Sequence, residues 1–310
     1  MATLHYAVMH HWEVAMSVTA IFMALFCVLC YTGQNFFNKL YAIHYAGPAG
    51  TATPVFAAIY GLLTGIATLA YNSFQFQISG VTLTLGVASG VMLFVFNLSL
   101  INASRSGPYA FQSIMMLFGN ILLPMLFSVL WWGDRLTKLQ LVGIVVMLLS
   151  FVIFNLKGLK FDGLKKGYFL WVALLFISNG VYGILLDSQQ RLMRQTQRNE
   201  MIITTFLVSA LISLIYLIVL QGKRAPKAFC MGANNWIFAL LSSTCAALAV
   251  NILMLALQLV PASILYTVAN GGVLVLCALL GTVALHEKLE KHMIAGLAVA
   301  VVSLAILGIQ

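Results

Sequence analysis

The stretch from Pro108 to Ser150 reads PYAFQSIMMLFGNILLPMLFSVLWWGDRLTKLQLVGIVVMLLS, and a degraded copy, PASILYTVANGGVLVLCALLGTVALHEKLEKHMIAGLAVAVVS, runs from Pro261 to Ser303. Position 261 follows position 108 by 153 residues, and the same displacement, close to half of the 310 residues, relates every matched pair. The chain is therefore predicted to contain one fold unit twice. The matched residues are Gly119 with Gly272, Asp134-Arg135-Leu136 with Glu287-Lys288-Leu289, Lys138 with Lys291, and Gly143 with Gly296.

The composition indicates that this unit folds in a membrane. Hydrophobic residues make up 62% of the chain and charged residues 7%, with a mean hydropathy of +1.01. Such a chain has too little polar surface to cover a water-soluble globule. The formal net charge of +9 comes from 16 Lys and Arg against 7 acids, clustered in short connections. This pattern favours loops near anionic membrane lipids over nucleic acid as a partner, because a nucleic-acid site would need a basic stripe on a soluble domain.

Charges, prolines and glycines divide the chain into stretches of about 20 mostly apolar residues, the length of a membrane-spanning helix. Because each half contains five such stretches, the second half must enter the membrane from the opposite side. We therefore expect an all-α integral membrane protein with ten transmembrane helices, arranged as two inverted five-helix repeats, 1–157 and 158–310. The predicted spans are 15–35, 50–72, 81–102, 108–132 and 139–156, then 167–188, 200–220, 235–257, 262–285 and 292–309.

The turn that closes each half carries a family resemblance. Gly133-Asp134-Arg135-Leu136 is followed by Gly143, and His286-Glu287-Lys288-Leu289 is followed by Gly296. With ten predicted helices in two halves, the chain resembles the drug/metabolite transporter superfamily, specifically its EamA-like ten-helix members. The resemblance implies a central cavity, lined by the first, third, fourth, sixth, eighth and ninth helices, that opens alternately to each side. It also implies export, and the bacterial plasma (inner) membrane as the location.

Loop charges and the resemblance predict opposite orientations. Family members usually keep both termini in the cytoplasm. Eleven of the 16 basic residues lie opposite the amino terminus, so the positive-inside rule places both termini outside. The five on the amino-terminal side are Arg135, Lys138, Arg191, Arg194 and Arg198.

The predicted membrane interior contains uncharged polar and aromatic side chains. A charged group at the bilayer centre costs several kcal/mol and is retained for function, yet Glu13, Asp187 and Glu200 fall at helix ends. Export driven by a mid-helix Glu, and phosphate binding by a mid-membrane base, are therefore disfavoured. The candidate substrate-binding residues lie on helices that the resemblance assigns to the cavity: Tyr31, Gln34, Asn35, Asn97, Gln112, Asn120, Asn179, Tyr182, Asn251, Tyr266 and Asn270.

Each candidate also has a structural interpretation. Asn and Gln join transmembrane helices through hydrogen bonds worth about 0.6 to 2 kcal/mol, and a Tyr in a bundle is often a packed ring with one bonded hydroxyl. Pro124 and the Gly271-Gly272 pair are candidate gating positions, where a helix could loosen, with close packing as the alternative.

Residues near span ends are interpreted as contacts with the membrane surface. Arg191, Arg194 and Arg198 recur at i, i+3 and i+7 and predict a basic face that binds lipid headgroups, with a funnel for substrate as the alternative. Tryptophan is typical of the interface, and four tryptophans lie at span ends: Trp12, Trp131, Trp132 and Trp236.

Redox and metal chemistry are not expected. The five cysteines include Cys27 and Cys30 at C-x-x-C spacing, but four of the five lie in apolar stretches and are interpreted as small buried hydrophobes. His10, His11 and Glu13 lack a fourth ligand for a metal site.

The sequence therefore predicts a secondary transporter that moves a small neutral or zwitterionic, amino-acid-like metabolite by alternating access. No cofactor or metal is predicted, and the protein is expected to act as a monomer or homodimer. A lipid-headgroup flippase, or a flippase subunit, would keep the fold and change the cargo. An intramembrane enzyme is the remote alternative, because it needs converging catalytic groups within the bilayer, and Asp187 is the only plausible acid.

Overall fold

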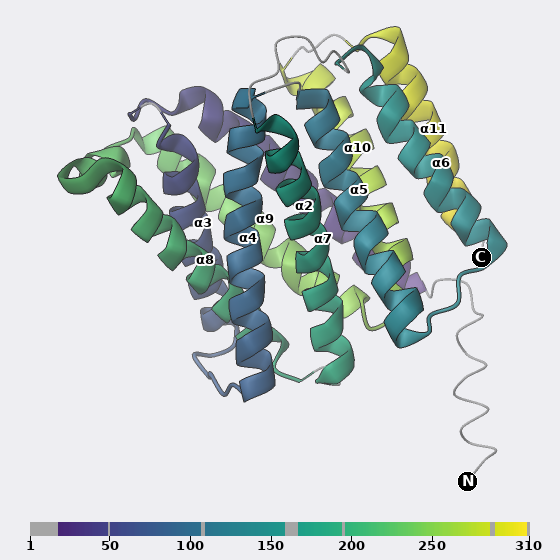
Figure 1. Cartoon of the computed structure of the whole chain (residues 1–310), viewed down its shortest axis with the longest axis horizontal. Helices are drawn as coiled ribbons and strands as arrows, with labels where there is room; N and C mark the ends of the chain where they lie inside the picture. The colour runs from purple at the N-terminus through teal and green to yellow at the C-terminus, as the bar shows by residue number, and fades with distance from the viewer. Residues whose placement is uncertain are drawn as a thin grey trace.

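A computed structural model describes the chain at residues 18–48, 50–106, 109–158, 167–193, 196–285 and 289–308. Across these ranges the chain is helical and contains no β-strand, and consecutive long helices run in alternating directions (Figure 1). The long helices are α2 (Val18–His44), α3 (Ala52–Tyr71), α4 (Gly80–Ser106), α5 (Tyr109–Phe127), α6 (Lys138–Phe154), α7 (Tyr168–Leu192), α8 (Arg198–Gln221), α9 (Ala233–Ala256), α10 (Ala262–Leu285) and α11 (Lys291–Gly308).

Three short helical segments extend or connect these helices. The π-helix η2 (Ser128–Trp132) continues α5, and the 3-10 segments η3 (Leu156–Gly158) and η4 (Gly222–Phe229) follow α6 and α8. We call the end of the bundle at which α3, α5, α7 and α9 end, and the next helices begin, the α7 end; it is the lower edge of Figure 1.

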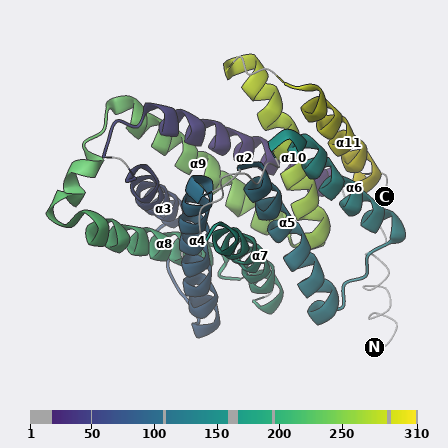
Figure 2. The ribbon, with the colours of Figure 1, turned by 45° about the horizontal axis from the view of Figure 1, so that its top comes forward.

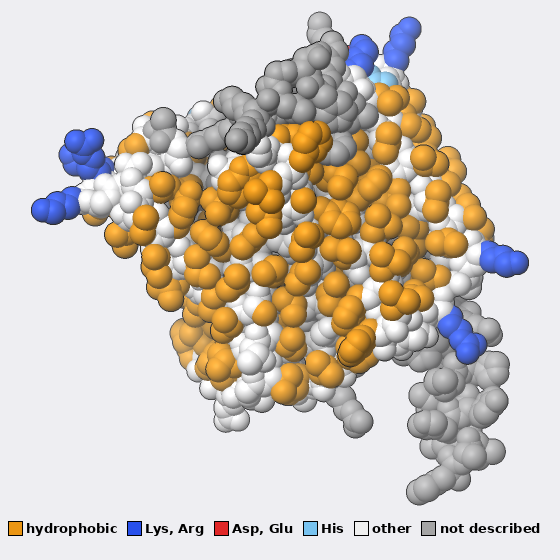
Figure 3. All heavy atoms as spheres, viewed as in Figure 1, with side chains coloured by type: hydrophobic (Ala, Val, Ile, Leu, Met, Phe, Trp, Pro, Cys, Tyr) orange, Lys and Arg blue, Asp and Glu red, His pale blue; other side chains and the backbone are white. Residues whose placement is uncertain are grey.

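Eight of the described helices are long and apolar enough to cross a membrane. Their outward faces carry large apolar side chains; Phe22 is 68% exposed, Leu130 82% and Val219 77%. On the face drawn in Figure 3, hydrophobic side chains cover the middle and basic side chains lie at the edges. These features are those of a multi-pass helical membrane protein. Because α6 and α11 have only 17 and 18 residues, ten crossings stay a prediction.

The predicted end of the first span was wrong. The sequence suggested an end at position 35, whereas α2 continues to His44. Polar residues in its second half bond to α9 instead of ending the helix: the Ser242 hydroxyl donates to Asn38, and Asn235 Nδ2 donates to the Tyr41 carbonyl at 3.2 Å. Polar residues thus continue a helix when a neighbouring helix provides their partners.

Eight of the long helices form a closed ring. In the order α2, α9, α3, α8, α4, α7, α5 and α10, each packs against the next, and α10 returns to α2 (Figure 2). Buried side chains of α2, α7, α8, α9 and α10 meet in one cluster, to which α3 and α4 add partly buried residues. The ring therefore surrounds a common centre, and α6 and α11 pack outside it as a pair against α10.

The α6–α11 contact is reciprocal. An ideal Cβ at Gly143 would lie 2.8 Å from Leu307 Cγ, and one at Gly296 would lie 2.7 Å from the Phe154 backbone. Only glycine permits this closeness, and the Ser303 hydroxyl adds a 2.7 Å hydrogen bond to the Gly143 carbonyl. The displacement of 153 that relates Gly143 to Gly296 also relates position 154 to position 307. The contact of Gly143 with residue 307 and the contact of Gly296 with residue 154 are therefore equivalent in the repeat.

The turn between η2 and α6 has a local cause. Gly133, at φ 72°, is left-handed and ends η2, a conformation that other residues adopt only with strain. Thr137 Oγ1 then accepts from the Gln140 amide, and Gln140 Oε1 accepts from the Thr137 amide, a capping box that starts α6. Asp134 lies between Gly133 and the capping box, and its side chain takes no part in either of them. In the second copy of this turn, residues 286–288 lie outside the described ranges.

Candidate functional site

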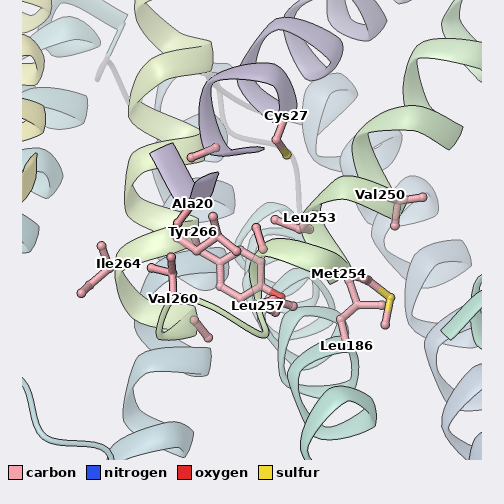
Figure 4. Packing of buried hydrophobic residues seen from close by; sticks show 14 of the residues in the cluster. Ala20, Cys27, Leu186, Val250, Leu253, Met254, Leu257, Val260, Ile264 and Tyr266 are labelled. Carbon is pink, nitrogen blue, oxygen red and sulfur yellow. The ribbon is translucent and has the colours of Figure 1, made fainter. Parts of the chain in front are cut away.

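Four tyrosines meet at the centre of the ring. Tyr31 of α2, Tyr60 of α3 and Tyr182 of α7 are partly buried and pack against the same cluster as Tyr266 of α10, which is 3% exposed. The side chain of Tyr31 lies near those of Tyr60, Tyr182 and Tyr266. Figure 4 shows the Tyr266 ring beside Leu257, the residue that follows α9. Side chains that lie inside a helix ring and remain partly accessible are suited to contact a bound small molecule.

The tyrosine hydroxyls have defined hydrogen bonds. Tyr266 donates to the Gly183 carbonyl of α7 at 3.0 Å, and Gln34 Nε2 donates to the Tyr60 hydroxyl at 3.1 Å. Gln34 Oε1 is buried without a partner in the described part of the chain, as is Asn251 Oδ1, although Asn251 Nδ2 donates to the Ala247 carbonyl. Buried acceptors without donors are uncommon, and a bound molecule with N–H or O–H groups would satisfy them.

An amide pair joins α5 to α10 next to this cluster. Asn120 Nδ2 donates to Asn270 Oδ1 at 3.3 Å, and Asn270 Nδ2 donates to the Tyr266 carbonyl at 2.6 Å. An ideal Cβ at Gly183 would lie 3.5 Å from Asn120 Oδ1 and 2.9 Å from the Pro124 ring. Helices α5, α7 and α10 therefore meet at one polar junction, and both asparagines are partly buried there.

Four predicted site residues bond to neighbouring helices, line a separate hollow or are exposed. Asn179 Nδ2 donates to the Met116 carbonyl at 2.8 Å and ties α7 to α5, and Gln112 Nε2 donates to the Leu100 carbonyl at 3.0 Å and ties α5 to α4. Asn97 lines a small hollow between α3, α4 and α8, and Asn35 is exposed. These contacts fit the interhelical interpretation of buried amides, and a binding role for these four stays a prediction.

The candidate gating residues are sites of close packing. Pro124 lies inside α5, its ring against Gly183. An ideal Cβ at Gly271 would overlap Met147 of α6, and one at Gly272 would lie 2.8 Å from Val28 of α2. Since both glycines allow a neighbouring helix to approach, the contacts favour packing. A gating function for these three residues stays a prediction.

The prediction that Arg191 binds lipid headgroups was wrong. Its guanidinium donates through Nε to Asp187 Oδ2 at 2.8 Å, and through Nη1 and Nη2 to Asp134 Oδ1 and Oδ2 at 2.9 and 2.6 Å. It also lies 5.5 Å from the centroid of Trp132, which was predicted to face the interface. Because Asp134 is 57 positions away, sequence spacing could not reveal this contact. Arg194 lies outside the described residues, and Arg198 is partly buried and donates to Asn199.

Sequence reasoning missed two residues of the site. Tyr60 was not considered because the second helix was assigned outside the cavity, although a Tyr in the middle of the 50–72 span is itself a signal. Asp187 was interpreted as a helix-end acid, whereas it is 2% exposed and lies near Tyr266. A carboxylate therefore borders the centre, which the sequence had indicated to be uncharged.

The structure describes all five cysteines, but not the residues near the amino terminus that were considered as metal ligands. Cys27 and Cys30 are buried, Cys245 and Cys277 are partly buried, Cys230 is exposed, and all five thiols are free. The described residues contain no group of three His, Cys, Asp or Glu side chains that could hold a metal ion. His10, His11, Trp12 and Glu13 lie outside the described residues.

Comparison with known proteins supports the fold alone. No protein-family model matches the chain, and none of the curated proteins matches it. Among solved structures, 29 chains match. One, described only as "Crystal structure of protein", has a TM-score of 0.72 and 18% sequence identity, and the match covers 93% of this chain and 96% of that one. At this identity the similarity establishes a shared overall fold, with nearly all of both chains superposable, and carries no information on cargo.

Proposed function

We propose that this chain is a secondary transporter that moves a small neutral or zwitterionic, amino-acid-like metabolite across the bacterial inner membrane by alternating access, in the direction of export. In this proposal it has ten membrane helices in two inverted halves and is similar to EamA-like members of the drug/metabolite transporter superfamily. The observation that carries the proposal is the ring of eight helices around four tyrosines and the Asn120–Asn270 pair.

The helix pairings support two equivalent halves. Exchange of α2 with α7, α3 with α8, α4 with α9, α5 with α10 and α6 with α11 converts each major contact into another. The α2–α9 contact becomes α7–α4, α3–α9 becomes α8–α4, and α2–α10 becomes α7–α5, whereas α3–α8, α5–α10 and α6–α11 remain the same. A two-fold axis produces this pattern, and transporters with inverted repeats bind cargo where the halves meet.

The short helices α6 and α11 are compatible with ten crossings. A helix of about 17 residues is the lower limit for spanning the hydrocarbon core, and α6 and α11 contain 17 and 18 residues. Their partner contact through Gly143 and Gly296 is the tight small-residue packing that joins helices in lipid.

The chemistry of the centre supports an amino-acid-like cargo. The aromatic faces of Tyr31 and Tyr182 can attract an ammonium group through cation–π contacts. Gln34 Oε1 and Asn251 Oδ1 are acceptors without donors among the described residues and suit N–H or O–H groups. Amides and hydroxyls can in turn donate to a carboxylate. A zwitterion would satisfy both kinds of group and require little net countercharge.

Uptake of radiolabelled neutral amino acids into proteoliposomes tests the proposal. Asn120→Ala, Asn270→Ala and Tyr60→Phe alter the centre, whereas Asn102→Ala removes a partly buried amide that donates to the Leu98 carbonyl of its own helix, α4, and serves as the matched control. We expect transport by the parent and by Asn102→Ala, and a loss of at least about tenfold in the central variants, because about 1.4 kcal/mol of lost binding is a tenfold change.

Two results would contradict the proposal. Equal transport by the parent and all central variants would place the binding site elsewhere. Absence of amino-acid transport, combined with movement of fluorescent phospholipid between leaflets, would favour the flippase alternative on the same fold.

A further inference from the structure

Two carboxylates share one guanidinium at the α7 end of the bundle. Asp134 accepts two hydrogen bonds from Arg191 through its two oxygens, and Asp187 accepts one through Oδ2. With both acids ionised the group has a net charge of −1, and one bound proton makes it neutral. We call Asp134, Asp187 and Arg191 the ionic triad.

The two acids of the triad differ in what their oxygens contact. The side chain of Asp134 is 19% exposed, and both of its oxygens are bonded to Arg191. Asp187 is 2% exposed, and its Oδ1 is buried with no partner among the described residues. A proton can therefore bind at Asp187 Oδ1 without breaking either bond to Asp134.

The elements around Asp187 provide no second cation among the described contacts. The neighbouring turn contributes Asp134 and Trp132, and α10 contributes the Tyr266 hydroxyl, which donates to Gly183 instead. The adjacent residues of α7 meet neutral groups. Gln189 donates to Thr82 of α4 and to carbonyls of the loop before α8, and Gln190 contacts Met254 of α9 and Gln258 in the turn after it. Among the residues that the structure describes, no second cation compensates the negative charge of the triad, and a bound proton would do so.

The ionic triad also connects the two halves of the chain. Arg191 joins α7 to the turn before α6, and on the same end Ser79 donates to Gln197 at 2.8 Å and Asn72 donates to Glu200 at 3.2 Å. Separation of the halves at this end would break the Arg191–Asp134 bonds and admit water to Asp187. The hydration of Asp187 is therefore linked to whether this end is closed.

We propose that Asp187 is the proton-binding site that couples transport to a proton gradient. Because burial disfavours an uncompensated charge, Asp187 takes up a proton when the α7 end closes and releases it when that end opens and hydrates the carboxylate. Low pH thus favours the closed end and high pH the open end. The proposal rests on the proposed transport function for its role, but proton binding itself does not require a substrate.

Trp132 is a built-in reporter of the triad, since its ring lies against the Arg191 guanidinium. The measurement uses purified protein without substrate, in which Trp12, Trp131, Trp171 and Trp236 are replaced by Phe. Fluorescence of Trp132 is recorded from roughly pH 4.5 to 9, a range that includes the titration of buried carboxyl groups in other proteins. We expect one single-proton transition in this protein, no transition in Asp187→Asn, and an unchanged transition in Glu290→Gln, which removes an exposed acid elsewhere.

Several outcomes would overturn the proposal. A flat profile, a transition that Asp187→Asn retains, or a response to Na⁺ instead of pH would each do so. Should Asp187→Asn not fold, Asp187→Glu decides, because it keeps the carboxyl and must shift the midpoint; an unmoved midpoint contradicts the assignment.

A second measurement separates coupling from transport. In proteoliposomes with radiolabelled neutral amino acids, a pH gradient should drive accumulation by the parent, whereas Asp187→Asn should retain exchange and lose the accumulation. Exchange by the parent with no effect of the gradient would overturn the coupling. No transport of any kind, together with an intact Trp132 titration, would contradict the proposed function and leave the proton site standing.

Discussion

Asn120 of α5 donates a 3.3 Å hydrogen bond to Asn270 of α10, so that two amides from opposite halves of the chain meet beside the central tyrosines. In the repeat alignment these asparagines are not equivalent, because Asn120 matches Val273 and Asn270 matches Leu117. The pair therefore arises where the two copies differ. A contact found in one copy can contribute to the binding of a specific cargo, whereas contacts that both copies retain stabilise the shared fold.

The amide pair predicts a measurable coupling between Asn120 and Asn270. In a double-mutant cycle with Asn120→Ala and Asn270→Ala, we expect an interaction free energy of about 0.6 to 2 kcal/mol, because each single change leaves the other amide without its partner. The free energy of unfolding in mixed micelles measures it. Asn97→Ala combined with Asn120→Ala should be additive, since Asn97 lines a separate hollow. Additivity in the central pair as well would show that its hydrogen bond contributes nothing.

Because α5 and α7 approach each other closely at Gly180, a methyl group added at this position should lower the stability of the protein. An ideal Cβ at Gly180 would lie 2.6 Å from the Gly119 carbonyl oxygen and 2.5 Å from Leu123. Gly180→Ala should therefore lower the free energy of unfolding by about 1 to 3 kcal/mol through overpacking. Gly80→Ala is the control, because nothing lies within 4 Å of its Cβ. Thermal midpoints measure both; an unchanged midpoint in Gly180→Ala would mean that the two helices can separate at little cost.

The helical, membrane-spanning character could be predicted from composition and from the spacing of charges and glycines, because both depend on local sequence. The major helices lie where apolar stretches were predicted, and the error at the end of α2 came from polar residues whose partners are on α9. Site residues were harder to predict. Tyr31, Tyr182 and Tyr266 were selected and meet, but an amide such as Asn179 has the same sequence character whether it binds cargo or a backbone carbonyl. The Asp134–Arg191 pair depends on packing between distant helices, which periodicity does not encode.

The ion pair between Lys157 and Glu290 predicts a pH-dependent contribution to stability. Lys157 donates to Glu290 across the loops that flank α6 and α11, and this bond lowers the pKa of the Glu290 carboxyl. A carboxyl with a lowered folded-state pKa stabilises the protein above its unfolded pKa, and the stabilisation is lost as pH falls through the folded pKa. Lys157→Met should thus lower the thermal midpoint slightly at about pH 7 and not at about pH 3. Both side chains are largely exposed, so a shift of several degrees would exceed what this pair explains.

Lys227→Met provides the matched control for the ion pair. Lys227 is also an exposed base near a helix end, and its side chain has no hydrogen bond or ion pair among the described contacts. Its replacement should leave the thermal midpoint unchanged at both pH values. An equal shift in Lys157→Met and Lys227→Met would assign the effect to net charge.

Labelling of Cys230 can determine which end of the bundle faces the cytoplasm. It is an exposed free thiol between η4 and α9, opposite the α7 end. Since Arg191 is neutralised by two carboxylates, it adds little to the positive charge of the α7 end, and the bases Lys223, Arg224 and Lys227 favour a cytoplasmic location for η4. We expect a membrane-impermeant maleimide to label Cys230 in opened cells only. Labelling in intact cells, absent in Cys230→Ser, would establish the opposite orientation, with both termini in the cytoplasm.

Replacement of Arg191 by alanine and by lysine should change the free energy of unfolding by different amounts. Above the pH at which Asp187 takes up a proton, Arg191→Ala leaves the ionised Asp187 buried without a charged partner and should lower the free energy of unfolding by about 3 to 5 kcal/mol. Lysine keeps the charge but cannot reach both acids in the fork geometry of a guanidinium, so Arg191→Lys should recover only part of the loss. Adding Asp187→Asn to Arg191→Ala should restore stability, because it removes the stranded charge. Arg198→Ala, at a partly buried arginine bonded to Asn199, is the control. If the double variant is no more stable than Arg191→Ala alone, the guanidinium stabilises the bundle through Asp134 and Trp132, and its charge is not required to compensate Asp187.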